Sequence, residues 1–221
     1  MYMSNTILSW PTLARAAPFT VLLGPDYSGK SSALRILAGR QDFTVVSYDK
    51  AFTEPNHRLV AKVQREFMAE GLCAPAGRYS SDLLLTLLQV AVVHLRDQLL
   101  AAPRGMPLIM DSYYFKILSK CALLGHANEA LFSWWRSFPR PDRVVYLDVP
   151  PDVAWQRSGH GASVNAMEHY GERPTKSGFM DLQEDLRRAM LMEVAGLDLH
   201  ILDTCEDVES TTRLIEKSAV N

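Results

Sequence analysis

The sequence has little of what marks secreted or zinc-binding proteins. Only three of its 221 residues are cysteines, and Cys73, Cys121 and Cys205 lie far apart without a C-x-x-C pair. An odd and scattered set predicts free thiols in a reducing compartment, so we expect a cytoplasmic protein. The six histidines show no ligand spacing with these cysteines, so we expect no structural zinc.

Charge and hydropathy argue against two further classes of partner. The formal net charge of −2 leaves no basic excess for DNA or RNA, so no nucleic acid is expected. The most apolar stretch, residues 83–100, is interrupted by Arg96 and Asp97 and is predicted to be a buried helix rather than a membrane span. Residues 1–17 lack a charged segment followed by a long apolar core, so we expect no signal peptide. The predicted partners are therefore small molecules.

One eight-residue stretch organises the chain. Residues 24–31 read Gly-Pro-Asp-Tyr-Ser-Gly-Lys-Ser and fit the phosphate-binding pattern G-x-x-x-x-G-K-[ST], the P-loop. An apolar, strand-like run at 19–23 precedes them and a helical pattern at 31–38 follows, which is the context that the motif needs. Its glycines let backbone N–H groups turn toward an anion, and the helix N-terminus adds a positive dipole end. The alternative is a plain glycine turn between a strand and a helix.

The P-loop predicts ATP and Mg²⁺ as cofactors. Lys30 is expected to reach the β- and γ-phosphates, and the Ser31 hydroxyl to ligate the metal. The residues predicted here to bind the nucleotide are Gly24, Asp26, Tyr27, Ser28, Gly29, Lys30, Ser31 and Ser32.

Strand and helix patterns alternate along the rest of the chain. Further strands are predicted at 43–47, 108–110, 144–147 and 199–202, with helices between and after them. This alternation predicts an α/β fold, a P-loop NTPase-type three-layer sandwich whose five-stranded parallel sheet carries helices on both faces. Ligands are expected at the carboxyl ends of its strands. The length suits a single domain over residues 1–221, with an N-terminal arm at 1–17 and a lid at 158–178, a long segment rich in Gly, Ser, His and charge.

Four stretches, in this order, resemble the thymidylate kinase family of P-loop nucleoside monophosphate kinases. They are the P-loop with an acid at its third position, Asp-Ser-Tyr at 111–113, the segment 141–157 and the segment 201–208. The resemblance covers residues 19 to about 217. The third stretch is the most specific to the family, whereas the first is common to P-loop proteins.

The resemblance implies roles for several residues. Asp26 corresponds to an acid that binds the acceptor's sugar hydroxyl, and Asp111 to one near Mg²⁺ and the transferring phosphoryl group. Arg157, with Arg173 or Lys176 from the lid, would neutralise charge during transfer. Residues 203–206, among them Asp203 and Thr204, would line the adenine pocket. The family is usually homodimeric through apolar helices, which makes residues 83–95 a candidate dimer surface.

The chain departs from the family where the acceptor phosphate binds. Arg-Glu-Pro-Gly after the second strand is replaced by Ser-Tyr-Asp-Lys at 47–50, and the long helix has Val-Ala-Val-Val at 90–93 where an arginine is expected. Ser112 stands in place of the arginine of Asp-Arg-Tyr. Lysine does not reproduce the bidentate grip of arginine on phosphate, although it supplies charge. The lysines available to supply this charge are Lys50, Lys116 and Lys120.

Several assignments have ordinary structural alternatives. Asp111 is either near the metal or a helix N-cap, and Asp26 is either an acceptor ligand or a turn residue. Asp49 is either a general base, as the related deoxynucleoside kinases use a glutamate there, or a turn residue. Lys116 and Lys120 are either acceptor-site cations or solvated charges on a helix face.

We therefore predict an ATP- and Mg²⁺-dependent kinase that acts on a nucleotide, a nucleoside or a related small acceptor. Its catalytic residues are predicted to be Lys30, Asp49, Asp111, Arg157 and Arg173. One rival is a kinase that phosphorylates a metabolite hydroxyl with Asp49 as base. The other is a nucleotide-binding regulatory ATPase, which would hydrolyse ATP slowly and act on a partner protein.

Overall fold

The computed structural model describes residues 16–40, 42–49, 51–52, 57–71, 78–203 and 207–220. Five strands form one sheet in the order β2-β3-β1-β4-β5, and every neighbouring pair is parallel. Their bounds are β1 Phe19–Leu23, β2 Thr44–Val46, β3 Leu108–Asp111, β4 Arg143–Asp148 and β5 Asp198–Asp203. The predicted five-stranded parallel sheet is therefore confirmed.

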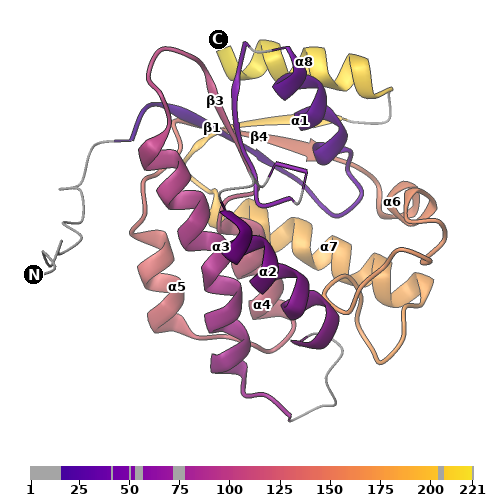
Figure 1. Cartoon of the computed structure of the whole chain (residues 1–221). Coiled ribbons are helices and arrows are strands. Elements are labelled where there is room, and N and C mark those ends of the chain that lie inside the picture. Colours follow the sequence, from indigo (N-terminus) through magenta and orange to yellow (C-terminus); the bar gives the residue numbers. More distant parts are fainter. Residues whose placement is uncertain are drawn as a thin grey trace, which may run out of the picture.

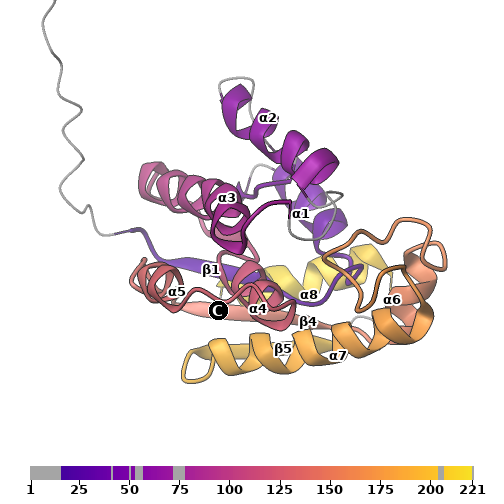
Figure 2. The same ribbon diagram turned by 90° about the horizontal axis from the view of Figure 1, so that it is seen from below.

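Helices cover both faces of this sheet (Figures 1 and 2). One apolar cluster joins α1 and α8 to one face, and a larger cluster joins α3, α4, α5 and α7 to the other. The helices are α1 Lys30–Gly39, α2 Arg58–Glu66, the π-helical turn η2 Phe67–Gly71, α3 Ser81–Ala101, α4 Phe115–Leu123, α5 Glu129–Arg136, α6 Pro151–Arg157, α7 Lys176–Glu193 and α8 Val208–Val220. The three-layer arrangement predicted from the alternating patterns is present.

The sequence of the central strand β1 does not alternate between polar and apolar residues, because both of its faces are covered. All five of its side chains are buried, because helices pack on both faces of a parallel sheet. Val21 and Leu23 lie in the larger cluster, whereas Leu22 lies in the cluster under α1 and α8. The register pairs Leu22 with Asp111 of β3, so the P-loop after β1 and the acid ending β3 meet at one edge of the sheet.

Long helix α3 begins where the sequence predicts. The Ser80 hydroxyl accepts a hydrogen bond from the backbone N–H of Leu83, the usual N-cap geometry. Among the described residues, α3 is the one helix long and apolar enough to cross a bilayer by length and composition, a test that core helices also pass. Here α3 packs on α2, and Leu85, Val92 and Leu99 lie in the larger cluster.

Helix α4 does not begin directly after β3. Ser112 and Tyr113 have positive φ angles of 56° and 49°, and the helix begins at Phe115. Non-glycine residues rarely adopt this left-handed conformation, and such strain gathers at functional sites. The N-terminal arm up to residue 15, Lys50, Cys73, Thr204 and Cys205 lie outside the described residues.

Candidate active site

The P-loop has the backbone geometry that phosphate binding requires. Gly24 and Gly29 have φ angles of 150° and 93°, in the region that favours glycine. A Cβ atom on Gly24 would lie 2.6 Å from the carbonyl oxygen of Leu147, so the close approach of β4 also demands glycine. The loop leads directly into α1, whose first turn is open to an anion.

Lys30 lies across this loop. Its Nζ donates to the carbonyl oxygens of Gly24 at 2.9 Å and Pro25 at 2.8 Å, and to Ser28 Oγ at 3.0 Å. Burial, followed by repulsion from Lys116, holds the pKa of Lys30 well below its ordinary value. A buried ammonium held only by neutral oxygens is suited to exchange them for phosphate oxygens.

A cavity of about 650 Å³ opens above the loop. We call it the donor cavity. Most of the predicted nucleotide-binding residues line it, together with Arg157 and Asp111. Gly24, Arg173 and Asp203 are not among the lining residues, so their predicted contacts with the nucleotide remain predictions. The lining consists of Asp26, Tyr27, Ser28, Gly29, Lys30, Ser31, Ser32, Arg35, Asp111, Ser112, Lys116, Arg157, Glu168, Asp207, Val208 and Thr211.

Asp111, the last residue of β3, is oriented by two serines, one after β2 and one after β3. Its Oδ2 accepts from Ser47 Oγ and its Oδ1 from Ser112 Oγ, each at 2.9 Å. The alternative of a helix N-cap is wrong, because the N-cap of α4 is Tyr114. The described part of the chain holds no group of three or more His, Cys, Asp or Glu residues close enough to bind a metal by themselves. A hydroxyl on Ser31 and a carboxylate on Asp111 fit Mg²⁺, which takes few protein ligands beside phosphates and water.

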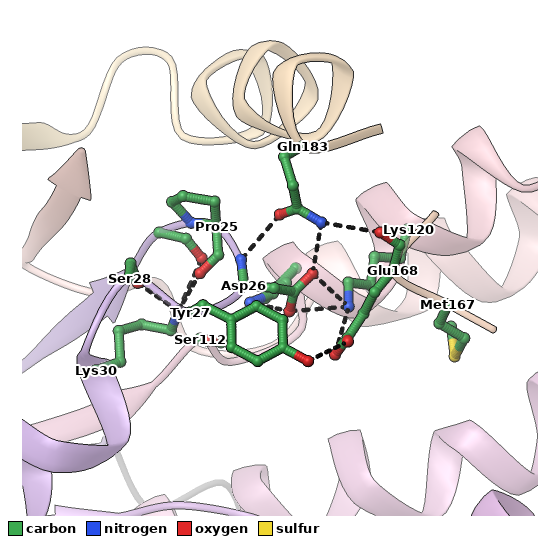
Figure 3. Close-up of polar contacts among 12 residues, drawn as sticks. Pro25, Asp26, Tyr27, Ser28, Lys30, Ser112, Lys120, Met167, Glu168 and Gln183 are labelled. Atoms are coloured by element: carbon green, nitrogen blue, oxygen red, sulfur yellow. Dashed lines mark hydrogen bonds and ion pairs between the residues drawn. The ribbon is translucent and has the colours of Figure 1, made fainter. Parts of the chain in front are cut away.

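Asp26 is the centre of a buried charge cluster (Figure 3). Lys116 Nζ lies 2.7 Å from its Oδ1, and Lys120 Nζ lies 3.0 Å from Oδ1 and 2.8 Å from Oδ2. The side-chain amide of Gln183 donates to Oδ2 at 3.0 Å, while its oxygen accepts from the Asp26 backbone N–H at 2.9 Å. Burial alone would raise the pKa of Asp26, but the two lysines outweigh it and hold that pKa well below its ordinary value.

These contacts remove two alternatives. The two lysines are not solvated charges on a helix face, because their side chains are only 13% and 10% exposed. Asp26 is not a simple turn residue, because its carboxylate joins α4 and α7 to the P-loop. Its predicted bond to an acceptor hydroxyl remains a prediction.

The segment expected to be a lid lies against the P-loop. Tyr27 Oη donates to the carbonyl oxygen of Ser163 at 2.7 Å and to Glu168 Oε2 at 2.9 Å. Gln183 Nε2 also donates to the carbonyl oxygen of Glu168, at 3.3 Å. The segment is shorter than predicted, since α7 begins at Lys176.

Gln183 and Glu168 were not predicted from the sequence. Gln183 had a detectable signal, because it interrupts the apolar face formed by Phe179, Leu182, Leu186 and Met190 at helical spacing. A buried amide on such a face needs polar partners. Glu168 had no such sequence signal, since it lies in an irregular segment whose fold the sequence pattern does not reveal.

A second cavity of about 320 Å³ lies beside the first. We call it the acceptor cavity. Asp49 lines it, and its Oδ1 accepts from the Ala51 backbone N–H at 2.9 Å. Four residues, Asp26, Asp111, Ser112 and Lys116, line both cavities. The rest of the acceptor lining comprises Tyr48, Asp49, Gln64, Met68, Leu88, Leu95, Tyr113, Ile117, Lys120, Asn165 and Met167.

Fold and site together define a P-loop nucleotide-kinase-like protein. No protein-family model matches the chain. It is 26% identical over 197 residues to the thymidylate kinase of Schizosaccharomyces pombe, covering 86% of this chain and 85% of that one. The solved thymidylate kinase of Candida albicans has a TM-score of 0.60 at 17% identity, covering 91% of this chain and 90% of that one. The solved deoxyadenosine kinase from M. mycoides, with products dCMP and dCDP bound, has a TM-score of 0.56 at 13% identity, covering 90% of this chain and 96% of that one.

These similarities confirm the resemblance to the thymidylate kinase family that the motifs predict. They also support the prediction of an ATP-dependent kinase.

Proposed function

We propose that this chain is a Mg²⁺-dependent phosphotransferase that moves the γ-phosphoryl group of ATP to a nucleotide, a nucleoside or a related small acceptor. The observation that carries the proposal is the pair of cavities that share Asp26, Asp111, Ser112 and Lys116. In-line transfer needs a donor and an acceptor that meet at one point, and these four residues mark that point.

The chain's own residues would act by positioning and by neutralising charge. Backbone N–H groups of the P-loop and Lys30 hold the phosphates, and Ser31 and Asp111 are the residues that would hold the metal. A bound Mg²⁺ would neutralise phosphate charge. The acceptor oxygen forms a bond to the γ-phosphorus while the bond to the β,γ-bridging oxygen breaks, and ADP leaves with the electron pair. Arg157, whose Nη1 lies 3.4 Å from the Tyr27 carbonyl oxygen, lies beside the loop and would neutralise charge during transfer.

A second candidate is transfer to a hydroxyl on a compound that carries no phosphate. The observation that favours it is the charge of the acceptor cavity. Its described lining holds three carboxylates, on Asp26, Asp49 and Asp111, but no arginine, and both its lysines are paired with Asp26. A dianionic phosphate is best held by arginine forks, whereas a hydroxyl needs a base to take its proton. Asp49 would be that base.

The test is a phosphoryl-transfer screen with γ-labelled ATP, Mg²⁺ and a panel of nucleosides, nucleoside monophosphates and sugars. Thymidine and thymidine monophosphate form a matched pair that differs only in the phosphate. We expect label on at least one acceptor, with thymidine monophosphate below the usual enzymatic range for kcat/KM of about 10⁴–10⁸ M⁻¹s⁻¹.

Asp49→Asn distinguishes transfer to a phosphate from transfer to a hydroxyl. It should lower turnover strongly only for an acceptor whose hydroxyl must lose a proton, because a phosphate acceptor is already ionised. If the enzyme uses thymidine monophosphate efficiently and Asp49→Asn does not slow this reaction, the acceptor group is a phosphate and Asp49 is not a base. Slow hydrolysis of ATP with no labelled acceptor would instead indicate a regulatory ATPase.

We also propose that the protein is a cytoplasmic homodimer. Within the helix surface named from the sequence, residues 83–95, Leu83 at the start of α3 is 44% exposed, whereas Leu85, Val92 and Leu95 are buried in the core. Sedimentation of the wild type and of Leu83→Glu would test the dimer.

A further inference from the structure

Two lysines of α4 share one carboxylate but have different positions relative to the two cavities. Lys116 and Lys120 lie one turn apart, Lys120 is buried and the Lys116 side chain is only 13% exposed, and both contact Asp26 within 3 Å. Lys120 lines only the acceptor cavity, whereas Lys116 lines the donor and acceptor cavities. Of the described residues that line both cavities, Lys116 alone is a cation.

We infer that Lys116 is a catalytic residue that contacts the γ-phosphoryl group while it passes from ATP to the acceptor. The inference rests on the proposed function and assigns this site a cation that the P-loop motif does not include. During transfer, negative charge spreads over the three equatorial oxygens of the phosphoryl group. A fixed cation at the point of transfer stabilises this state more than the bound ATP, and so raises the rate.

Electrostatics around Lys116 support the assignment. Burial lowers the pKa of Lys116, but Asp26, and to a smaller extent Asp111, outweigh burial and raise it above its ordinary value. Lys116 therefore stays charged in a buried place. Burial, followed by repulsion from Lys116, lowers the pKa of the P-loop residue Lys30, so positive charge on one of these lysines disfavours it on the other. A phosphate chain entering the donor cavity would relieve that repulsion.

Asp26 would then be the residue that positions Lys116. Its carboxylate also contacts Lys120 and Gln183, so it keeps two partners when Lys116 turns toward the phosphoryl group. Transfer forms the bond from the acceptor oxygen to phosphorus and breaks the bond to ADP, and Lys116 gains and loses no proton in this step.

The test compares Lys116→Gln with Lys120→Gln, a matched control. Each change removes one positive charge from beside the same buried carboxylate and leaves an amide that can donate to it, so a purely structural role predicts equal effects.

We expect K116Q to lower kcat by about 10²- to 10³-fold, as loss of a group that stabilises transition-state charge does. KM for ATP should change little. K120Q should instead act mainly on KM for the acceptor. Lys116→Arg keeps the charge and should recover part of the lost kcat.

A binding measurement gives a readout apart from turnover. Aluminium fluoride with ADP mimics the transferring phosphoryl group, so calorimetry should show that K116Q binds ADP normally but loses the gain in affinity from aluminium fluoride. K120Q should keep that gain. Equal kcat losses in the two glutamine variants, or a K116Q protein that transfers at the wild-type rate, would overturn the inference. A wild type that labels no acceptor would refute the proposed function instead, and slow hydrolysis of ATP by water would then serve for the same comparison.

Discussion

The donor and acceptor cavities are built in different ways. The donor side takes seven of its sixteen lining residues from one continuous stretch, residues 26–32, and the P-loop lysine Lys30 is held by backbone carbonyls and a hydroxyl. The acceptor side gathers side chains from the P-loop, the ends of β2 and β3, helices α2, α3 and α4, and the segment before α7. Local backbone chemistry therefore makes the first cavity, and long-range side-chain packing makes the second.

The difference in charge follows from the difference in construction. Lys30 donates its hydrogen bonds to neutral oxygens, although the charges of Asp111 and Asp26 also act on it, so its ammonium can exchange these bonds for an incoming phosphate chain. Asp26 instead compensates Lys116 and Lys120 before any ligand arrives. Lys30 on the donor side can thus take up an anion, whereas the two lysines of the acceptor side are already paired with a carboxylate.

Removing the Asp26 charge should have the largest effect, because it removes the carboxylate that both Lys116 and Lys120 contact. Asp26→Asn should lower the free energy of unfolding by about 3–5 kcal/mol at pH 7, the usual cost of breaking a buried pair. Since the folded state lowers the pKa of Asp26, its stabilisation is complete above its ordinary value of 3.8 and declines as the pH falls further. Urea unfolding should therefore show a difference between wild type and variant that is constant from pH 7 to about pH 4 and shrinks below.

Asp42→Asn is the matched control for this experiment, because Asp42 is exposed. It should change stability by less than about 0.5 kcal/mol, as surface substitutions generally do. A D26N protein as stable as D42N would mean that the cluster contributes nothing and that the two cavities do not differ in the way described.

The same contrast explains what the sequence could reveal. The strand, loop and helix around residues 19–38 follow from spacing and glycine placement, which act over a few residues. The predicted sheet was right for a similar reason, since each strand is a short apolar run bounded by turns. The cluster at Asp26 was not predictable, because its partners Glu168 and Gln183 come from segments more than 140 residues away. Lys116 and Lys120 were recognised as candidate cations, but their shared carboxylate appears only in the folded chain.

On the donor side, Lys30→Ala should abolish most activity without unfolding the protein. The β- and γ-phosphates lose their point charge while the backbone cradle remains, so we expect a loss of about 10²- to 10³-fold in kcat. Labelled transfer under single-turnover conditions measures this effect, and circular dichroism verifies the fold. Near wild-type turnover in the folded variant would show that the assignment of the P-loop is wrong.

The smallest expected effect concerns Tyr27, which joins the donor loop to the segment expected to be a lid. Tyr27→Phe removes the hydrogen bonds to Ser163 and Glu168 but keeps the ring, which packs near Phe179. We expect the opening free energy of residues 158–175 to fall by about 0.5–1.5 kcal/mol, the net worth of a typical hydrogen bond. Hydrogen exchange should therefore be faster in this segment of the variant, and should slow in the wild type when an ATP analogue and an acceptor are both bound. If neither change appears, the segment is a fixed part of the site rather than a lid, and the contact with Tyr27 serves packing alone.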